Sequence, residues 1–413
     1  MSKMQLKATA LTQQVMKEYY ANCRESQARG RKVAWATVMM PTELLLAADI
    51  DVLFPENHAA TCGAKALGPE LSELAEAAGL SQETCSYVRC DLGVRKGGTS
   101  PWGGMPAPDI VFCATSSCTT VTKWFEELER FYACRFAMVD MPYNFSGAIT
   151  DHSVDYIVAQ LEDCILQIEA LTGKPYDYAR LEEVVELAET AHEYWRKCLE
   201  LGATNPSPIT TTDILVNMGP IVCLRGTQAA VDVYKTLYEE LLERIRIGYV
   251  AAGEERFRLV WDNIPFWFGL GSTVRRLSAY GAVIVGATYL YHWVRSVDPK
   301  DPLRSMGRAY STAITMNQSV LHKIEKISNM LKLYQADGLI IHSNRSCKPD
   351  SLGSLDLKRA VETNLNIPVL MVDGDHTDSR AVSDAVVQTR MEAFIEMLER
   401  RKFGELRLAP KLV

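Results

Sequence analysis

Residues 108–143 read PDIVFCATSSCTTVTKWFEELERFYACRFAMVDMPY, and their pattern decides the fold. The apolar run at 108–115 predicts a strand, and residues 119–133, with apolar positions three and four apart, predict a helix. Residues 136–143 predict a second strand. A strand, a helix and a strand in this order are typical of a parallel sheet covered by helices. The stretch therefore predicts an α/β fold.

The same alternation extends toward the N-terminus. Apolar runs predict strands at 31–39 and 50–54, on either side of a helix at 41–49 that Pro41 is expected to open. A further helix is predicted near residues 70–79. We therefore expect an N-terminal α/β lobe over residues 1–150, preceded by an amphipathic helical segment.

Residues 151–254 follow a different pattern, dominated by long amphipathic helices such as 153–173 and 230–248. Alternating strands and helices then return over residues 255–413. The predicted strands of this third part are at 257–265, 281–290, 337–343 and 367–375, and the predicted helices are at 317–336 and 384–401. The chain is thus expected to form two α/β lobes with a helical segment between them.

Composition and charge exclude several classes of protein. The 413 residues are 47% hydrophobic and 23% charged, as in ordinary globular proteins. The net charge of -7 is spread over the chain, so no basic face for nucleic acid or anionic lipid is expected. The charged N-terminus does not resemble a signal peptide, and no long apolar run predicts a membrane span. We expect a cytoplasmic protein.

Cysteine is unusually frequent for a cytoplasmic protein, where disulfides are rare. The eleven cysteines are at positions 23, 62, 85, 90, 113, 118, 134, 164, 198, 223 and 347. Cysteine is among the most buried residue types, so core packing is the ordinary explanation for each of them, and Cys164 and Cys198 in helical patterns fit it. No C-x-x-C occurs, so a metal or cluster site would have to be assembled from distant segments.

Two cysteines occupy positions where a parallel sheet exposes its chemistry. Cys118 and Cys347 each follow a predicted strand, and ligands of such sheets bind beyond the carboxyl ends of the strands. Cys85, in a polar segment after a predicted helix, can complete a set of three. Three thiolates can hold three irons of a cubane cluster and leave the fourth iron open. The pattern by itself leaves both this cluster and plain core packing as explanations.

Six segments carry a resemblance to a known family. They are AWATVMMPTELLLAADIDVLFPENHAA (34–60), ETCSYVR (83–89), CATSSCTTVTKWFEEL (113–128), NMGPIVCLRG (217–226), HSNRSCK (342–348) and VDGDHTDSRA (372–381). In this order they resemble the subunits of 2-hydroxyacyl-CoA dehydratases and ATP-dependent benzoyl-CoA reductases. The likeness extends from about residue 30 to about residue 400.

The resemblance implies a cofactor and partners. Each such subunit has two Rossmann-like lobes and a helical part, and binds a [4Fe-4S] cluster through three cysteines, which correspond here to Cys85, Cys118 and Cys347. The open iron would pass one electron into the thioester carbonyl of an acyl-CoA to give a ketyl radical anion. The partners implied are a related second subunit and a separate ATP-hydrolysing iron-sulfur activator. The isolated GLGST at 269–273 lacks the spacing and lysine of a P-loop, so ATP is left to the activator.

The branch of the family is inferred from one position. Dehydratases of this type commonly carry a serine beside the cluster, where this chain has Val38. Expulsion of a hydroxyl needs a hydrogen-bonding group, since an unpaired buried polar group costs about 2 to 7 kcal/mol. We therefore expect a benzoyl-CoA reductase-type subunit. An (R)-2-hydroxyacyl-CoA dehydratase subunit and a non-catalytic electron-relay subunit are the alternatives, and a one-residue shift that turned Thr37 inward would weaken the choice.

Glu56 and His58 are the candidate proton-transfer residues, because they form a polar turn directly after the strand predicted at 50–54. A carboxyl or imidazole in a dry pocket can serve as general acid or base. The structural alternative is that Glu56 caps a helix or pairs with an arginine. Aromatic residues gather at 261–271 and 287–293, so Trp267 and Phe268, with Val38 and Met39, can form apolar walls for an aromatic substrate. The alternative for this group is ordinary core packing.

Overall fold

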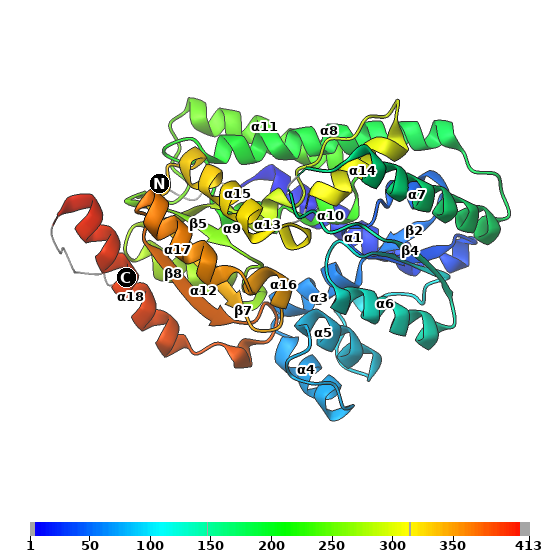
Figure 1. The fold of residues 1–413 in the computed structure, drawn as a ribbon, viewed down its shortest axis with the longest axis horizontal. Helices are drawn as coiled ribbons and strands as arrows, with labels where there is room; N and C mark the ends of the chain where they lie inside the picture. The colour runs from blue at the N-terminus through cyan, green and yellow to red at the C-terminus, as the bar shows by residue number, and fades with distance from the viewer. Residues whose placement is uncertain (1–4, 147, 314, 405–413) are drawn as a thin grey trace.

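The computed structural model describes residues 5–146, 148–313 and 315–404. The chain forms two α/β lobes, each built on a four-stranded parallel sheet, together with a set of long helices (Figure 1). This confirms the predicted fold class. The division into three domains stays a prediction.

The N-terminal sheet has the strand order β2-β1-β3-β4. Every neighbouring pair is parallel, so helices must connect the strands across the faces of the sheet. The strands are β1 (Val33–Ala36), β2 (Asp51–Leu53), β3 (Ile110–Ala114) and β4 (Arg135–Val139). The connecting helices are α2 (Glu43–Ala47), α3 (Pro55–Ala64), α4 (Gly68–Ala77), α5 (Ser86–Arg95) and α6 (Thr119–Tyr132).

The C-terminal sheet repeats this topology with the strand order β6-β5-β7-β8. Its strands are β5 (Phe257–Asp262), β6 (Ala282–Ala287), β7 (Gly338–Asn344) and β8 (Val369–Gly374). Its helices are α12 (Leu270–Ser278), α13 (Thr288–Tyr291), α14 (Pro302–Thr312), α15 (Val320–Leu333), α16 (Lys348–Ser351), α17 (Ser354–Leu365) and α18 (Asp384–Phe403). In both sheets the first strand lies between the second and the third, so the chain reverses its direction of winding there.

A set of helices joins the two lobes. The long ones are α1 (Lys7–Arg24), α7 (Asp151–Thr172), α8 (Tyr178–Gly202) and α11 (Gln228–Arg246), and α9 (Thr211–Val216) and α10 (Gly219–Cys223) are short. Helix α8 contacts α2 of the first lobe and β6 of the second, and it packs along α11 at the top of Figure 1. Short 3₁₀ turns complete the secondary structure: η1 (Gln27–Arg29), η2 (Pro101–Gly103), η3 (Trp267–Gly269), η4 (Thr315–Asn317) and η5 (Ser379–Ala381).

The predicted strands and long helices are present, with differences at their ends. The strand predicted to reach residue 143 stops at Val139, because its neighbour β3 ends opposite it at Ala114. Pro41 does not open α2, which begins at Glu43 after Thr42. The sequence patterns did not predict α5, α12, α14 or α17. The polar turn expected at Glu56 and His58 is the first part of helix α3, and the strand expected at 281–290 ends at Ala287, where α13 begins. Among the described residues, no helix combines the length and apolarity that crossing a bilayer requires.

Candidate active site

The three candidate cluster ligands share one structural position. Cys85, Cys118 and Cys347 each occupy the N-cap, the residue directly before the first residue of a helix, in α5, α6 and α16. Cys118 and Cys347 follow the equivalent strands β3 and β7 of the two lobes. The Val121 backbone N–H donates to the Cys118 Sγ at 3.4 Å. Free backbone N–H groups at helix starts favour a thiolate over a thiol.

The three thiols lie within electrostatic reach of one another. Burial raises the pKa of each, most strongly that of Cys347. Negative charge on Cys85 and Cys118 raises the pKa of Cys347 further, and charge on Cys118 does the same for Cys85. In the described part of the chain, no three Cys, His, Asp or Glu side chains converge as one metal ion would require. A cubane needs a wider arrangement, because each thiolate binds a different iron.

A buried group of polar side chains lies beside Cys85. His376 Nε2 lies 2.9 Å from the Ser86 Oγ and 3.8 Å from the Cys85 Sγ. Its Nδ1 lies 2.7 Å from the Asn344 side-chain amide, at the end of β7. Burial lowers the pKa of His376 to about 4, so the imidazole is neutral at pH 7. The arrangement joins the start of α5 to the loop after β8.

Arg89 forms ion pairs that also connect α5 to the loop after β8. It lies on α5, one turn after Cys85, and its guanidinium donates to Asp378 at 2.7 Å and to Asp375 at 3.2 Å. A third contact, to Glu76 of α4, measures 3.1 Å. Arg89 is only 2% exposed, so these ion pairs are shielded from water. Cys85 belongs to the first lobe but is held in place by acidic residues of the second.

A cavity of about 280 Å³ contains Glu56. Its walls come from α1, α3, α10 and the segment around η3 and α13, and they include Val38, Asn57, Trp267 and Tyr289. The Val38 backbone N–H donates to the Glu56 carboxylate at 2.7 Å. Burial raises the pKa of Glu56 to about 7, against the opposing effects of this hydrogen bond and of Arg225. A carboxyl with that pKa exchanges protons readily near neutral pH.

The electrostatic effects of Glu56 show that this cavity lies near the cysteines. Its negative charge raises the pKa of Cys118, after the larger effect of burial. It raises the pKa of Tyr289 in the same way, and the charge of Cys347 also acts on Tyr289. The cavity, the carboxyl and two of the three thiols are therefore neighbours.

A chain of hydrogen bonds ends at Tyr289. The Trp267 indole N–H donates to the Tyr87 hydroxyl at 2.7 Å. Burial and the negative charge of Glu56 raise the pKa of Tyr289. A hydrogen bond with the Tyr87 hydroxyl lowers this pKa, which is expected when Tyr87 is the donor and Tyr289 the acceptor. The phenol of Tyr289 remains protonated at pH 7. Tyr289 lines the cavity, so its phenol is a candidate hydrogen-bond donor there.

Of the four residues expected to form the apolar walls of a substrate pocket, two line this cavity and two do not. Val38 and Trp267 line the cavity. Met39 and Phe268 are not among its lining residues, and the Met39 sulfur lies 3.0 Å from Arg295 instead. The Thr37 hydroxyl accepts a hydrogen bond from the Ala114 N–H at 3.0 Å, so it is turned into the sheet.

His58 lies outside the group that lines this cavity. Its Nε2 is 2.9 Å from the Ser100 hydroxyl, and its Nδ1 is 4.0 Å from the Cys62 sulfur. Burial lowers the pKa of His58 to about 4. Glu56 and His58 lie less than one turn apart on α3, but only Glu56 lines the cavity. Proton transfer by His58 stays a prediction.

Two residues of this site were not singled out by sequence reasoning. Tyr289 stands in the sequence only as part of an aromatic stretch, and His376 only as part of the segment 372–381. Neither is conspicuous there, because their partners Tyr87 and Ser86 are about 200 and 290 residues away along the chain. For Tyr289 the available signal was a polar hydroxyl inside a mostly apolar stretch, and for His376 it was the position directly after a predicted strand.

Comparison with known proteins identifies the family. The pattern of the family described as "2-hydroxyglutaryl-CoA dehydratase, D-component" matches residues 37–398. The chain is 32% identical to the (R)-2-hydroxyisocaproyl-CoA dehydratase alpha subunit of Clostridioides difficile, over 96% of this chain and 97% of that one. It is 31% identical to the (R)-phenyllactyl-CoA dehydratase alpha subunit of Clostridium sporogenes, over 92% and 93%. A benzoyl-CoA reductase subunit of Thauera aromatica is 32% identical over 88% and 87%.

The chain therefore belongs to the 2-hydroxyglutaryl-CoA dehydratase D-component family, whose members include dehydratase alpha subunits and a benzoyl-CoA reductase subunit. This confirms the family inferred from the six segments. The relatives are mostly 2-hydroxyacyl-CoA dehydratase subunits, so the comparisons favour the dehydratase alternative over the expected benzoyl-CoA reductase.

Proposed function

We propose that the chain is the alpha-type subunit of an (R)-2-hydroxyacyl-CoA dehydratase. The observation that carries this proposal is the cavity where Glu56, with a pKa of about 7, lies next to Cys118 and the Tyr289 phenol. It offers a proton acceptor and a hydroxyl donor side by side. The names of the most similar relatives support the same choice.

The cysteines suit a [4Fe-4S] cluster. Cys85, Cys118 and Cys347 would hold it, since all three cap helices and their buried thiols have raised pKa values that a cationic cluster would relieve. When bound, such a cluster supplies a low-potential electron to the thioester carbonyl of an acyl-CoA. Three protein ligands leave one iron open to substrate.

The overall reaction converts a 2-hydroxyacyl-CoA into a 2-enoyl-CoA and water. The C2–O bond and one C3–H bond break, a double bond forms between C2 and C3, and the electron that starts the reaction is returned at the end. Glu56, as carboxylate, is positioned to take the C3 proton. Tyr289 donates a hydrogen bond to the leaving oxygen, which would otherwise be unpaired in an apolar wall.

Tyr289 also removes the reason for preferring a reductase. A benzoyl-CoA reductase was expected because Val38 cannot hydrogen-bond a leaving hydroxyl. Val38 does line the cavity, and this keeps reduction of an aromatic acyl-CoA as the second candidate. The polar group that Val38 lacks is supplied from α13, more than 200 residues away in the chain.

We further propose a related second subunit and a separate ATP-dependent activator as partners. The relatives are themselves named as subunits, which supports assembly with another chain. Leu321 and Leu352 are exposed large apolar side chains, and their chain neighbours Val320 and Gly353 pack against each other, so the two segments that carry them meet on one face of the chain. This face, beside Cys347, is the surface we assign to the second subunit.

The test is an anaerobic assay of the complete complex with its activator and reductant, supplied with (R)-2-hydroxyisocaproyl-CoA or benzoyl-CoA. We expect an enoyl-CoA from the first and no consumption of the second. Reduction of benzoyl-CoA without dehydration would select the second candidate. Turnover of neither substrate by a cluster-loaded complex would favour an electron-relay subunit.

The ligand set is tested by iron and sulfide analysis. Substitution of Cys85, Cys118 or Cys347 by Ser is expected to lower iron content sharply, because a hydroxyl is a much poorer iron ligand than a thiolate. Cys134→Ser is the matched control, since Cys134 is partly exposed and caps none of these helices. Full iron content in the three variants would contradict the assignment.

A further inference from the structure

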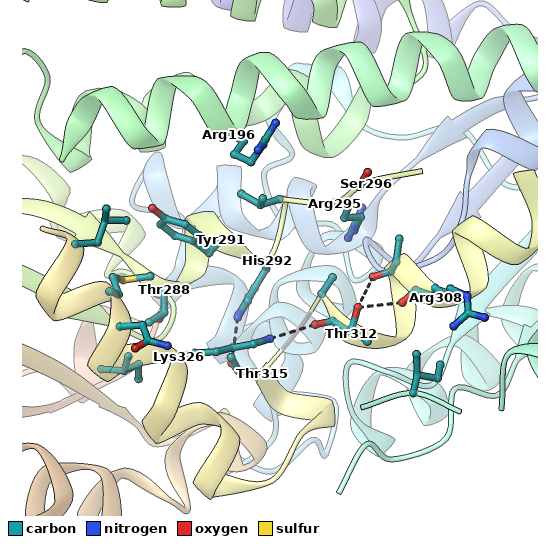
Figure 2. A pocket seen from close by; sticks show the side chains of 18 of the residues that line it. Arg196, Thr288, Tyr291, His292, Arg295, Ser296, Arg308, Thr312, Thr315 and Lys326 are labelled. Carbon is teal, nitrogen blue, oxygen red and sulfur yellow. Dashed lines mark hydrogen bonds between the residues drawn. The ribbon is translucent and has the colours of Figure 1, made fainter. Parts of the chain in front are cut away.

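A second cavity, of about 890 Å³, lies on the other side of α13. Thr288 lines this cavity and its neighbour Tyr289 lines the cavity of Glu56, so α13 separates the two. The walls come from α8, α14, α15 and the segment after α13 (Figure 2). Its volume is that of a site for a nucleotide-sized ligand.

The lining is strongly basic. Arg196, Arg295, Arg308 and Lys326 contribute four cations, and Glu189 contributes one carboxylate. Arg308 is paired with Asp151 and Arg196 with Glu200, so Arg295 and Lys326 are the lining cations without an ion pair among the described residues. The Glu189 carboxylate already accepts hydrogen bonds from the Val297 N–H at 2.6 Å and the Ser296 hydroxyl at 3.2 Å. We call this space the basic cavity.

Arg295 is a buried cation whose guanidinium stacks on the rings of Tyr310 at 4.1 Å and Trp293 at 5.2 Å, without a carboxylate at ion-pair distance among the described residues. It is 6% exposed, and its Nε and Nη1 atoms have no hydrogen-bond partner among the described residues. The third nitrogen, Nη2, reaches only the Met39 sulfur at 3.0 Å. A buried guanidinium with two unsatisfied N–H groups is costly unless an acceptor arrives from outside the chain.

The Glu43 carboxylate, which acts electrostatically on Arg295, is already engaged by other groups. Glu43 accepts from the Tyr310 hydroxyl at 2.6 Å and lies 3.7 Å from Arg225. The guanidinium groups of Arg225 and Arg295 therefore share the single carboxylate of Glu43, so these three side chains together carry excess positive charge. Arg225 lies deeper in the core, whereas Arg295 lines the basic cavity, so the excess charge is presented to that cavity.

Lys326 adds a second cation without a carboxylate partner, opposite Arg295. Figure 2 shows its side chain reaching toward Thr312, whose carbonyl oxygen accepts from Nζ at 3.2 Å. Burial lowers the pKa of Lys326, and no carboxylate of the described chain offsets this effect. The same view shows His292 directed at Thr315, 3.1 Å away, with no partner for its Nδ1 among the described residues.

We propose that the basic cavity binds a phosphate ester of nucleotide size, with Arg295 and Lys326 holding its phosphate groups. Several separated cations match the multiple charges of a phosphate ester better than the single charge of a carboxylate. Ile327, Met330 and Leu333 form an apolar wall on α15 that suits a base or a pantetheine arm. The ligand is either the coenzyme A part of the substrate, which rests on the proposed function, or a separate nucleotide.

Calorimetric titration of the full chain with coenzyme A and with ADP tests the site. Both Arg295→Met and Lys326→Met are expected to weaken binding of the responsible ligand about 10- to 100-fold, as for the loss of one charge-assisted contact. Lys332→Met is the matched control, because Lys332 lies exposed on the same helix outside the cavity and should bind like the unsubstituted chain. Lys326→Met keeps the test decisive if the buried Arg295 variant fails to fold.

Competition identifies the ligand. If an acyl-CoA displaces coenzyme A, and dephospho-coenzyme A binds more weakly than coenzyme A, the cavity is assigned to the coenzyme A part of the substrate. ADP binding that depends on Lys326 and resists displacement by acyl-CoA assigns it to a separate nucleotide. Binding of neither compound, or equal binding by the Lys326 and Lys332 variants, would overturn the proposal. Because no turnover is measured, a failed dehydration assay with intact coenzyme A binding would count only against the proposed function.

Discussion

At the scale of single residues, the burial of Glu56 affects both its proposed role in proton transfer and the stability of the chain. Its carboxyl is buried, held by one backbone N–H from Val38 and only partly offset by Arg225. The groups that face it, Tyr289 and the thiols of Cys118 and Cys113, are neutral at pH 7 when no iron is bound. The pKa of about 7 therefore follows from desolvation, and a proton acceptor is available just above neutral pH.

The first prediction concerns catalysis by Glu56. Because the carboxylate is the active form of a general base, kcat/KM should rise with pH and level off above about pH 7. Glu56→Gln should lower turnover by about 10²-fold or more, abolish this rise and leave iron content unchanged. The measurement is the pH profile of dehydration by the two complexes. An unchanged profile in the variant would show that Glu56 is structural.

The pH dependence of folding stability tests the raised pKa of Glu56 independently of catalysis. The folded-state pKa of about 7 lies above the ordinary value of 4.5, so the contribution of Glu56 to stability is fully present below pH 4.5 and is lost as pH rises through 7. Between pH 6 and pH 8.5 the unsubstituted chain should lose about 1.4 kcal/mol relative to Glu56→Gln. Denaturant unfolding of both chains at the two pH values measures this difference, and no difference would mean that the carboxyl is solvated.

At the scale of elements, α5 connects the two lobes through its first turns. It starts at Ser86, directly after Cys85, and its Arg89 reaches Asp375 and Asp378 in the loop after β8. Removing one partner of a buried ion pair leaves an uncompensated charge, which is more damaging than removing a surface pair. The position of Cys85 relative to Cys347 therefore depends on this element contact.

The second prediction follows from that contact. Arg89→Met should lower the free energy of unfolding by about 3 to 5 kcal/mol and reduce iron retention, because Asp375 and Asp378 lose their partner. Arg380→Met is the control, since Arg380 binds Asp378 at 2.7 Å from a more exposed position and should cost about 1 kcal/mol or less. Thermal unfolding and iron content measure both variants. Equal effects of the two would refute a special role of the α5 contact.

At the scale of the whole molecule, the two lobes meet by close approach of backbone. A Cβ atom on Gly68, at the start of α4, would lie 1.9 Å from the Thr377 carbonyl oxygen of the other lobe. Gly63 of α3 comes within similar reach of the Thr377 and Trp267 side chains. The two lobes can approach this closely because Gly63 and Gly68 have no side chain at the contact.

The third prediction tests this packing. Gly68→Ala should force the lobes apart, lower the thermal midpoint and reduce iron content, because the obstructing atom belongs to the backbone and cannot rotate away. Gly202→Ala is the control: its Cβ would meet neighbours at no less than 3.7 Å, near the end of α8. Iron content and melting curves of the two variants provide the comparison. A Gly68 variant as stable as the Gly202 variant would show that the lobes tolerate separation.

The sequence alone determined the α/β class, the long helices and the strand positions, because apolar periodicity reflects which face of each element is buried. It also singled out Cys118 and Cys347, since cysteines after parallel strands lie at the sheet edge that binds ligands. The family followed from six short segments and was confirmed by comparison. Short elements such as α5 and α12 were missed because tertiary contacts, rather than periodicity, stabilise helices of about ten residues.

Only the tertiary structure decided the side-chain environment of the site. It turned Thr37 into the sheet, placed Val38 and Tyr289 in one cavity, and separated His58 from Glu56. It also left two nitrogens of the buried Arg295 without a hydrogen-bond acceptor among the described residues, beside a large cavity. Such facts depend on contacts between residues far apart in the chain, and on burial that shifts a pKa, neither of which local pattern encodes.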